Sequence, residues 1–113
     1  MVKVKVLARY IEEQKISAID LIKIDVETFE YEVLSGYGKY FLAHQPIIVL
    51  EIQDRTIGKN IESLISNSSY EYYNIDEEKG LHKVNELGTS KHNNYVLCPG
   101  SKSALIKNFI ITN

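Results

Sequence analysis

Residues 19–36 read IDLIKIDVETFEYEVLSG, and this stretch decides the fold. Its first part, 21–26, is an almost continuous apolar run containing Lys23, a pattern typical of a strand inside a parallel sheet. The next part, 27–35, repeats apolar residues every three to four positions, which predicts an amphipathic helix that ends at Gly36. A strand that turns directly into a helix places the acidic residues between them at the carboxyl edge of a sheet, where open α/β proteins bind their ligands.

A second apolar run, 47–52, has the same character and carries the carboxylate of Glu51 near its end. Two such strands joined by one helix form a βαβ unit with parallel strands and a right-handed crossover. Because the carboxyl ends of adjacent parallel strands lie side by side, we expect Asp25, Glu27 and Glu51 to converge on one rim of the sheet.

The other periodic segments predict further elements of one mixed, mostly parallel α/β sheet with helices on its faces. We expect strands at 2–6, 70–75 and 94–98, helices at 8–14, 57–66 and 103–109, a polar turn at 76–80, and an irregular stretch or short strand at 81–87. No internal repeat or low-complexity linker divides the sequence, so residues 1–113 are expected to form a single domain.

The composition is that of an ordinary globular protein, with 44% hydrophobic and 25% charged residues. The net charge of −2 gives no reason to expect binding to nucleic acid or to an anionic membrane. The sequence has no apolar run of bilayer length and no signal-peptide pattern, which favours a cytoplasmic protein. The single cysteine, Cys98, lies in an apolar run, which predicts a buried thiol and excludes an internal disulfide.

The stretch 19–36 together with 46–52 resembles the signature of FkbM-family methyltransferases. At lower specificity, residues 2–11 resemble the strand and helix before that signature, and residues 94–99 resemble the closing strand of the family. The resemblance implies a Rossmann-like sheet and the transfer of a methyl group from S-adenosylmethionine. It also implies a hydroxyl oxygen of a small molecule or glycan as the methyl acceptor.

The same resemblance implies roles for the three rim carboxylates. Asp25 and Glu27 would be the catalytic residues, facing the methyl donor and the acceptor hydroxyl, and Glu51 would bind the substrate. The alternative is structural: carboxylates at a helix start are favoured by capping and by the helix dipole, and Glu51 can be a surface charge. Lys23 is expected to pair with a carboxylate or to extend to an edge of the sheet.

Two departures from the family pattern limit the expected activity. None of the six glycines follows an apolar strand and opens a helix, so the glycine-rich turn that positions a nucleotide-like cofactor is missing. Aligned by the signature, the sequence corresponds to the C-terminal part of the domain with the early strands missing. The family commonly has glycine where Thr28 stands, and a β-branched residue tolerates a positive φ poorly. We therefore expect a truncated, partial methyltransferase domain that binds the cofactor weakly or not at all by itself.

Two other function classes stay open. One is a non-catalytic interaction module, since a parallel strand without its neighbour exposes an edge that recruits a partner chain or a second copy. The other is a complete small enzyme of another kind, in which Asp25, Glu27 and Glu51 would be the acid–base group. No metal is expected, because His44, His82 and His92 share no metal-ligand spacing and are interpreted as solvated loop residues.

Overall fold

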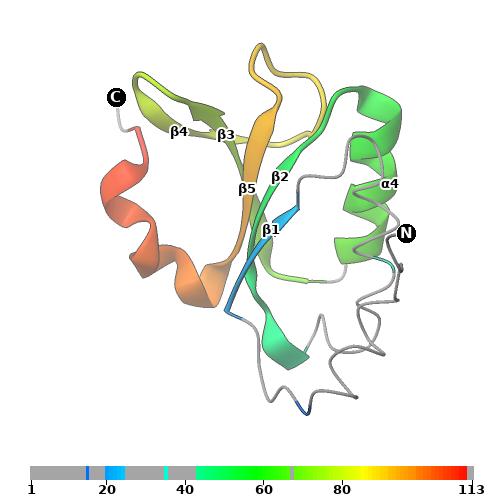
Figure 1. Cartoon of the computed structure of the whole chain (residues 1–113), viewed down its shortest axis with the longest axis vertical. Helices are drawn as coiled ribbons and strands as arrows, with labels where there is room; N and C mark the ends of the chain where they lie inside the picture. Colours follow the sequence, from blue (N-terminus) through cyan, green and yellow to red (C-terminus); the bar gives the residue numbers. More distant parts are fainter. Residues whose placement is uncertain (1–14, 16–19, 25–34, 36–42, 67, 112–113) are drawn as a thin grey trace, which may run out of the picture.

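The structure is a computed structural model, and it describes residue 15, residues 20–24, residue 35, residues 43–66 and residues 68–111. Within these residues the chain forms a five-stranded mixed sheet with an α-helix on one face and two short 3₁₀ helices on the other (Figure 1). The strands are β1 (Leu21–Ile24), β2 (Ile47–Glu51), β3 (Tyr70–Asp76), β4 (Gly80–Val84) and β5 (Asn94–Pro99). The helices are α4 (Arg55–Ile65), η1 (Gly100–Leu105) and η2 (Lys107–Phe109).

The strands lie in the order β1-β2-β5-β3-β4, so that β5, the last in sequence, occupies the centre (Figure 1). Strands β1 and β2 are parallel, in the register that pairs Leu21 with Ile47 and Ile24 with Leu50. The other three pairings, β2 with β5, β3 with β5 and β3 with β4, are antiparallel. The predicted single mixed sheet is therefore confirmed for these residues.

Several expectations need correction. Within the described residues the sheet is mostly antiparallel, because β5 runs against both of its neighbours and a tight turn joins β3 to β4. The terminal segment forms two 3₁₀ helices, η1 and η2, and not one α-helix. Of the two alternatives for residues 81–87, the short strand is correct for 81–84, which belong to β4, and the irregular stretch is correct for 85–87. The elements predicted at 2–6, 8–14 and 27–35 lie outside the described residues.

Helix α4 shows how local sequence sets an element boundary and its packing. Asp54 caps the helix, because its Oδ1 accepts a hydrogen bond of 2.9 Å from the backbone N–H of Ile57. Ile57, Ile61 and Ile65 then follow at intervals of four residues, which places them on one face of the helix. Ile61 and Ile65 are buried against the sheet and Ile57 packs beside them, so the apolar stripe predicted for this helix is confirmed at these three positions. Leu64, the fourth residue of the predicted stripe, is instead 38% exposed.

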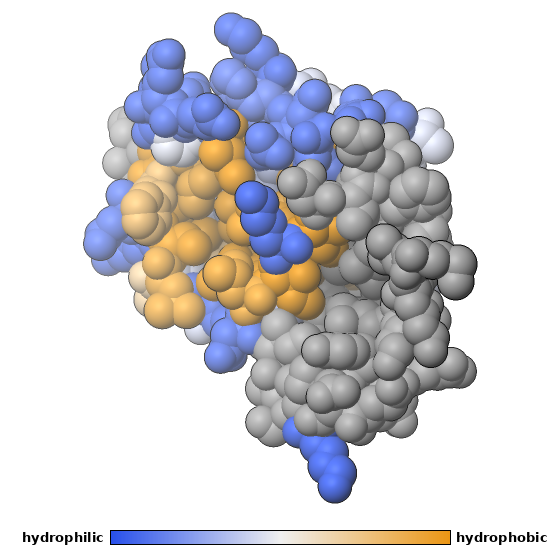
Figure 2. All heavy atoms as spheres, viewed as in Figure 1, coloured by the Kyte–Doolittle hydropathy of each residue, from blue (hydrophilic) through white to orange (hydrophobic). Residues whose placement is uncertain are grey.

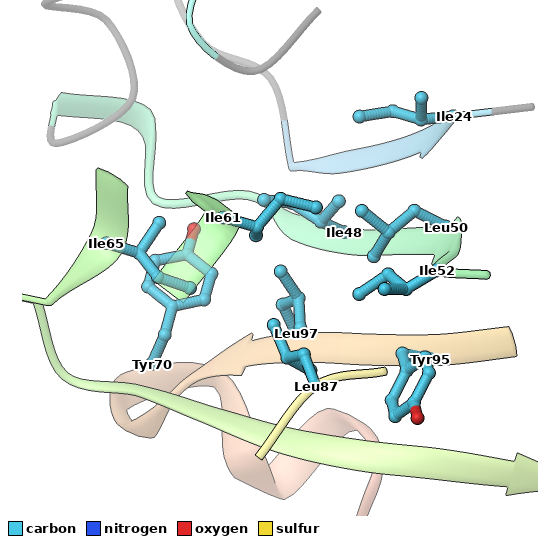
Figure 3. Packing of buried hydrophobic residues seen from close by; sticks show 10 residues of the cluster. All are labelled: Ile24, Ile48, Leu50, Ile52, Ile61, Ile65, Tyr70, Leu87, Tyr95 and Leu97. Carbon is cyan, nitrogen blue, oxygen red and sulfur yellow. The ribbon is translucent and has the colours of Figure 1, made fainter. Parts of the chain in front are cut away.

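The main core lies between α4 and the sheet (Figure 3). Its buried members are Ile24, Ile48, Leu50, Ile52, Ile61, Ile65, Tyr70, Leu87, Tyr95 and Leu97. A second cluster, on the opposite face and next to η1, consists of Ile47, Tyr73, Leu81, Val96, Cys98 and Ile106. Cys98 is buried, as predicted.

Strand β1 does not have the two covered faces that its apolar sequence predicts. Its side chains alternate between the faces of the sheet, since Ile24 is buried in the core under α4 while Leu21 remains 62% exposed on the opposite face. Lys23 shares that exposed face with Leu21, which explains how a cation is accommodated in an apolar strand.

Candidate functional site

Three strand ends meet at one edge of the sheet. Strands β1, β2 and β3 run in the same direction, and β5 runs in the opposite one. Glu51 at the end of β2, Asp76 at the end of β3 and Asn94 at the start of β5 consequently lie along the carboxyl edge. In the register of the sheet, Glu51 is paired directly with Asn94.

These residues line two adjoining hollows. The larger has a volume of about 640 Å³ and lies between Glu51 and Asn94 on one side and the turn after β3 on the other, with Asp76 and His92 in its wall. The smaller, of about 230 Å³, lies between the ends of β1 and β2. Glu51 and Asn94 belong to both walls, so they stand at the junction of the two hollows.

Asp76 is the most highly connected carboxylate of this edge. Its Oδ1 accepts hydrogen bonds from the backbone N–H groups of Glu78 (3.0 Å) and Lys79 (3.1 Å). Its Oδ2 lies 3.9 Å from Nε2 of His82 and 3.7 Å from Nε2 of His92. Burial disfavours the charged form, but the two backbone N–H donors and His92 outweigh it, so the pKa of Asp76 lies below its ordinary value.

A buried amide holds the loop that carries His92. Asn74 is only 4% exposed, and its Nδ2 donates to the backbone oxygens of His92 (2.6 Å) and Asn94 (3.2 Å). A buried polar side chain is stable only when it is hydrogen-bonded, so these two bonds fix the position of the loop relative to β3. Asn74 thereby holds the backbone of His92 beside β3, the strand that ends at Asp76.

The structure locates one of the three predicted rim carboxylates. Glu51 is partly exposed at the carboxyl edge, as the strand pattern predicts, and its Oε1 accepts a hydrogen bond of 2.7 Å from Nε2 of Gln53. Asp25 and Glu27 lie outside the described residues. Asp25 directly follows Ile24, whose pairing with Leu50 is the last one between β1 and β2. The roles assigned to Asp25, Glu27 and Glu51 stay predictions.

Sequence reasoning missed Asp76, His82 and His92. It treated Asp76 as a turn residue and both histidines as solvated loop residues. His82 comes near Asp76 because β3 pairs with β4. The short polar turn between these two segments is a sequence signal for such a hairpin, so this contact could have been predicted. His92 comes near Asp76 because β5 pairs with β3, and no local pattern in the sequence contains that long-range pairing. No group of three or more His, Cys, Asp and Glu residues in the described ranges has a geometry that could hold a metal ion.

The residues that the structure describes do not form a complete site for S-adenosylmethionine. Gly58 lies inside α4, Gly80 at the start of β4 and Gly88 in the loop after β4 have positive φ, and Gly100 follows the antiparallel strand β5. Gly100 also opens the short 3₁₀ helix η1, so the expectation that no glycine follows an apolar strand and opens a helix is wrong at this position. None of these four glycines forms the turn from a parallel strand into a helix that cradles such a cofactor. The hollow between β1 and β2 is also smaller than the roughly 300–1,000 Å³ of ordinary small-molecule pockets.

Comparison with known proteins gives one match. The model of the methyltransferase FkbM domain matches residues 2–87 of the 113 residues. No curated protein and no solved structure matches significantly. None of the helices in the described ranges is long and apolar enough to cross a membrane.

Proposed function

Because this chain belongs to the FkbM methyltransferase family, we propose that it serves methyl transfer from S-adenosylmethionine to a hydroxyl oxygen. Its part in the reaction is to bind the methyl acceptor at the carboxyl edge of the sheet. The observation that carries this proposal is the polar hollow of about 640 Å³ between Glu51, Asn94, Asp76 and His92.

The side chains around this hollow suit an acceptor with several hydroxyl groups. A carboxylate accepts hydrogen bonds from hydroxyl hydrogens, and an amide both donates and accepts. Glu51 and Asn94, paired side by side in the sheet, therefore offer adjacent partners for two neighbouring hydroxyls. A small polyol or a glycan is the class of acceptor that uses such a pair.

The acceptor oxygen must lose its proton when it takes the methyl group. A carboxylate within hydrogen-bonding distance can orient that hydroxyl and remove its proton. By family resemblance we assign this role to Asp25 and Glu27, and we assign binding of the acceptor to Glu51. S-adenosylmethionine supplies the electrophilic methyl group; because the described residues do not form its site, the binding of this cofactor is not assigned to any of them.

A second candidate function is a non-catalytic interaction module built on the same fold. The observation that favours it is the sheet face opposite α4, where Leu21, Leu105 and Phe109 are largely exposed. A module of this kind needs the surface and not the polar edge. Substitutions at Glu51 would then leave its function unchanged.

Acceptor binding is tested by recording amide NMR spectra of the ¹⁵N-labelled chain during titration with methyl glycosides and linear polyols. We expect shift changes concentrated at Glu51, His92 and Asn94. We expect Glu51→Gln to weaken the binding about tenfold or more, since a hydrogen bond to a charged group is worth about 1.5–3 kcal/mol. Glu86→Gln is the matched control, because Glu86 is an exposed carboxylate that pairs with Arg55 on α4 and does not line the hollow. Equal effects of both substitutions, or shifts elsewhere on the surface, would refute acceptor binding at this edge.

A further inference from the structure

The sheet face opposite α4 carries an apolar groove of about 470 Å³ beside η1 and η2 (Figure 2). The groove floor includes Ile47, Val49 and Val96. At its sides Leu105 is 68% exposed and Phe109 is 63% exposed, and Leu21 is exposed to a similar degree. Together these three side chains leave roughly 300–400 Å² of apolar surface in contact with water, which is the size of the largest patches on soluble monomers, patches that are often functional.

The groove and the ridge beside it carry opposite charges. Glu77, in the turn after β3, lines the groove and is exposed. Lys107 is exposed in η2, between the groove-lining residues Ile106 and Phe109 in the sequence; the exposed residues of η1 and η2 form the ridge beside the groove. Neither Glu77 nor Lys107 forms an ion pair with any other residue that the structure describes. The neighbouring Asp76, by contrast, is held by the hairpin and by His82 and His92.

We infer that this face binds a second copy of the chain in a symmetric dimer. Leu105 and Phe109 of each copy enter the groove of the other, and Lys107 faces the partner subunit's Glu77. A two-fold interface uses the same patch on both subunits. A surface that has exposed apolar side chains beside an apolar groove, and exposed charges of both signs in Glu77, Lys23 and Lys107, is therefore complementary to itself.

The size of the patch sets the strength of this dimer. Two copies together cover roughly 700 Å² of apolar surface, and the polar rims extend the contact to about 1,200 Å², the lower limit of specific interfaces. A dimer of this size is expected to dissociate in the micromolar range. Association through β1, the edge strand of the sheet within the described residues, is a competing arrangement, but it would leave Leu105 and Phe109 exposed.

Sedimentation velocity of the full chain from low micromolar to near-millimolar concentration tests the inference. We expect a reversible monomer–dimer equilibrium that Phe109→Asp weakens about tenfold or more, because it places a charge in the centre of the interface. Leu64→Asp is the matched control: Leu64 is 38% exposed, but it lies on α4 on the other side of the sheet, so the equilibrium should not change. Far-ultraviolet circular dichroism verifies that each variant is folded.

A charge exchange identifies the pairing itself. Lys107→Glu and Glu77→Lys should each weaken the dimer, and the double variant should recover it, because the exchanged charges again face each other across the two-fold axis. A chain that stays monomeric at all concentrations overturns the inference. A dimer that is indifferent to Phe109→Asp also overturns it, as does a double variant no tighter than the two single variants.

Discussion

Replacing Gly58 by alanine gives opposite expectations from local propensity and from packing. Gly58 is the fourth residue of α4, inside the helix, where alanine is favoured over glycine by about 1 kcal/mol. A Cβ at this position, however, would stand 2.0 Å from the backbone oxygen of Leu87 and 2.5 Å from its carbonyl carbon. Helix propensity thus predicts stabilisation, and the packing of α4 against Leu87 predicts the reverse.

The neighbouring backbone cannot move away without loss. The Leu87 oxygen accepts a hydrogen bond of 2.9 Å from Nη1 of Arg55, and the Leu87 N–H donates one of 2.8 Å to Oε2 of Glu62. The Leu87 side chain is fully buried in the main core. An ordinary contact of 3.4 Å requires the helix and this segment to separate by 3.4 − 2.0 = 1.4 Å, which breaks both bonds or strains the core.

We therefore expect Gly58→Ala to lower the free energy of unfolding by about 2–5 kcal/mol. Separating the two segments breaks two hydrogen bonds to charged groups, each worth about 1.5–3 kcal/mol, and the propensity gain offsets about 1 kcal/mol of that loss. Urea denaturation followed by circular dichroism measures the difference. Gly100→Ala is the matched control, because the nearest atom to its added Cβ is 3.6 Å away, and it should change stability by less than about 0.5 kcal/mol. If Gly58→Ala were as stable as the unmodified chain or more so, the close packing of α4 on Leu87 would be wrong.

The remaining predictions concern pH, the thiol and the cofactor. Burial opposes the charge of Glu62, but the hydrogen bonds from Arg55 and from the Leu87 N–H outweigh it, so its pKa in the folded chain lies below its ordinary value. Its contribution to stability is therefore complete above the unfolded pKa of about 4.3 and is lost as pH falls through the folded pKa. Glu62→Gln should lower the free energy of unfolding by about 1–2 kcal/mol at neutral pH. Urea denaturation at a series of pH values should show that the difference between this variant and the unmodified chain shrinks in acid. A difference that stays constant with pH would contradict the lowered pKa of Glu62. Burial raises the pKa of the Cys98 thiol, so a thiol reagent should label the native chain only as fast as it unfolds, and rapid labelling without denaturant would show that the strand is open. Calorimetric titration with S-adenosylmethionine should show binding no tighter than millimolar, because the sequence has no glycine-rich turn after a strand, and a micromolar dissociation constant would refute this reasoning.

Strong local patterns predicted the central part of the fold. The apolar run at 47–52 with Pro46 before it produced β2, and the apolar positions 57, 61 and 65 produced the buried face of α4. The βαβ reading also predicted correctly that β1 and β2 are parallel neighbours, because apolar strands with a helical segment between them have few other arrangements.

Long-range pairings could not be predicted in the same way. The central position of β5 depends on packing of Tyr95 and Leu97 under α4, and a strand pattern says nothing of its neighbours. The exposure of Leu21 has a similar origin, since the apolar character of a strand does not tell which of its faces another element covers.

In the candidate site, too, residues marked by a local sequence pattern were predicted and residues brought together by long-range pairing were not. Glu51 was located correctly, because a carboxylate at a strand end is visible in the sequence. Asp76 and His92 were missed, since they lie 16 positions apart and come together only through the pairing of β3 with β5. Asn74, whose amide holds the His92 loop, has no signal of its own in a strand that otherwise reads as a row of tyrosines.

The central claim is that the carboxyl edge of this sheet presents the methyl acceptor to S-adenosylmethionine. The most direct test gives S-adenosylmethionine with a radiolabelled methyl group to the chain, both alone and fused to the N-terminal part of another FkbM-family domain, and measures transfer to a panel of polyols and glycosides. We expect label on a hydroxyl oxygen, loss of transfer in Asp25→Ala and Glu27→Ala, a higher KM for the acceptor in Glu51→Gln, and unchanged turnover in Glu86→Gln. Full turnover in both alanine variants, with the label still on oxygen, would contradict the claim and reassign these carboxylates to structure.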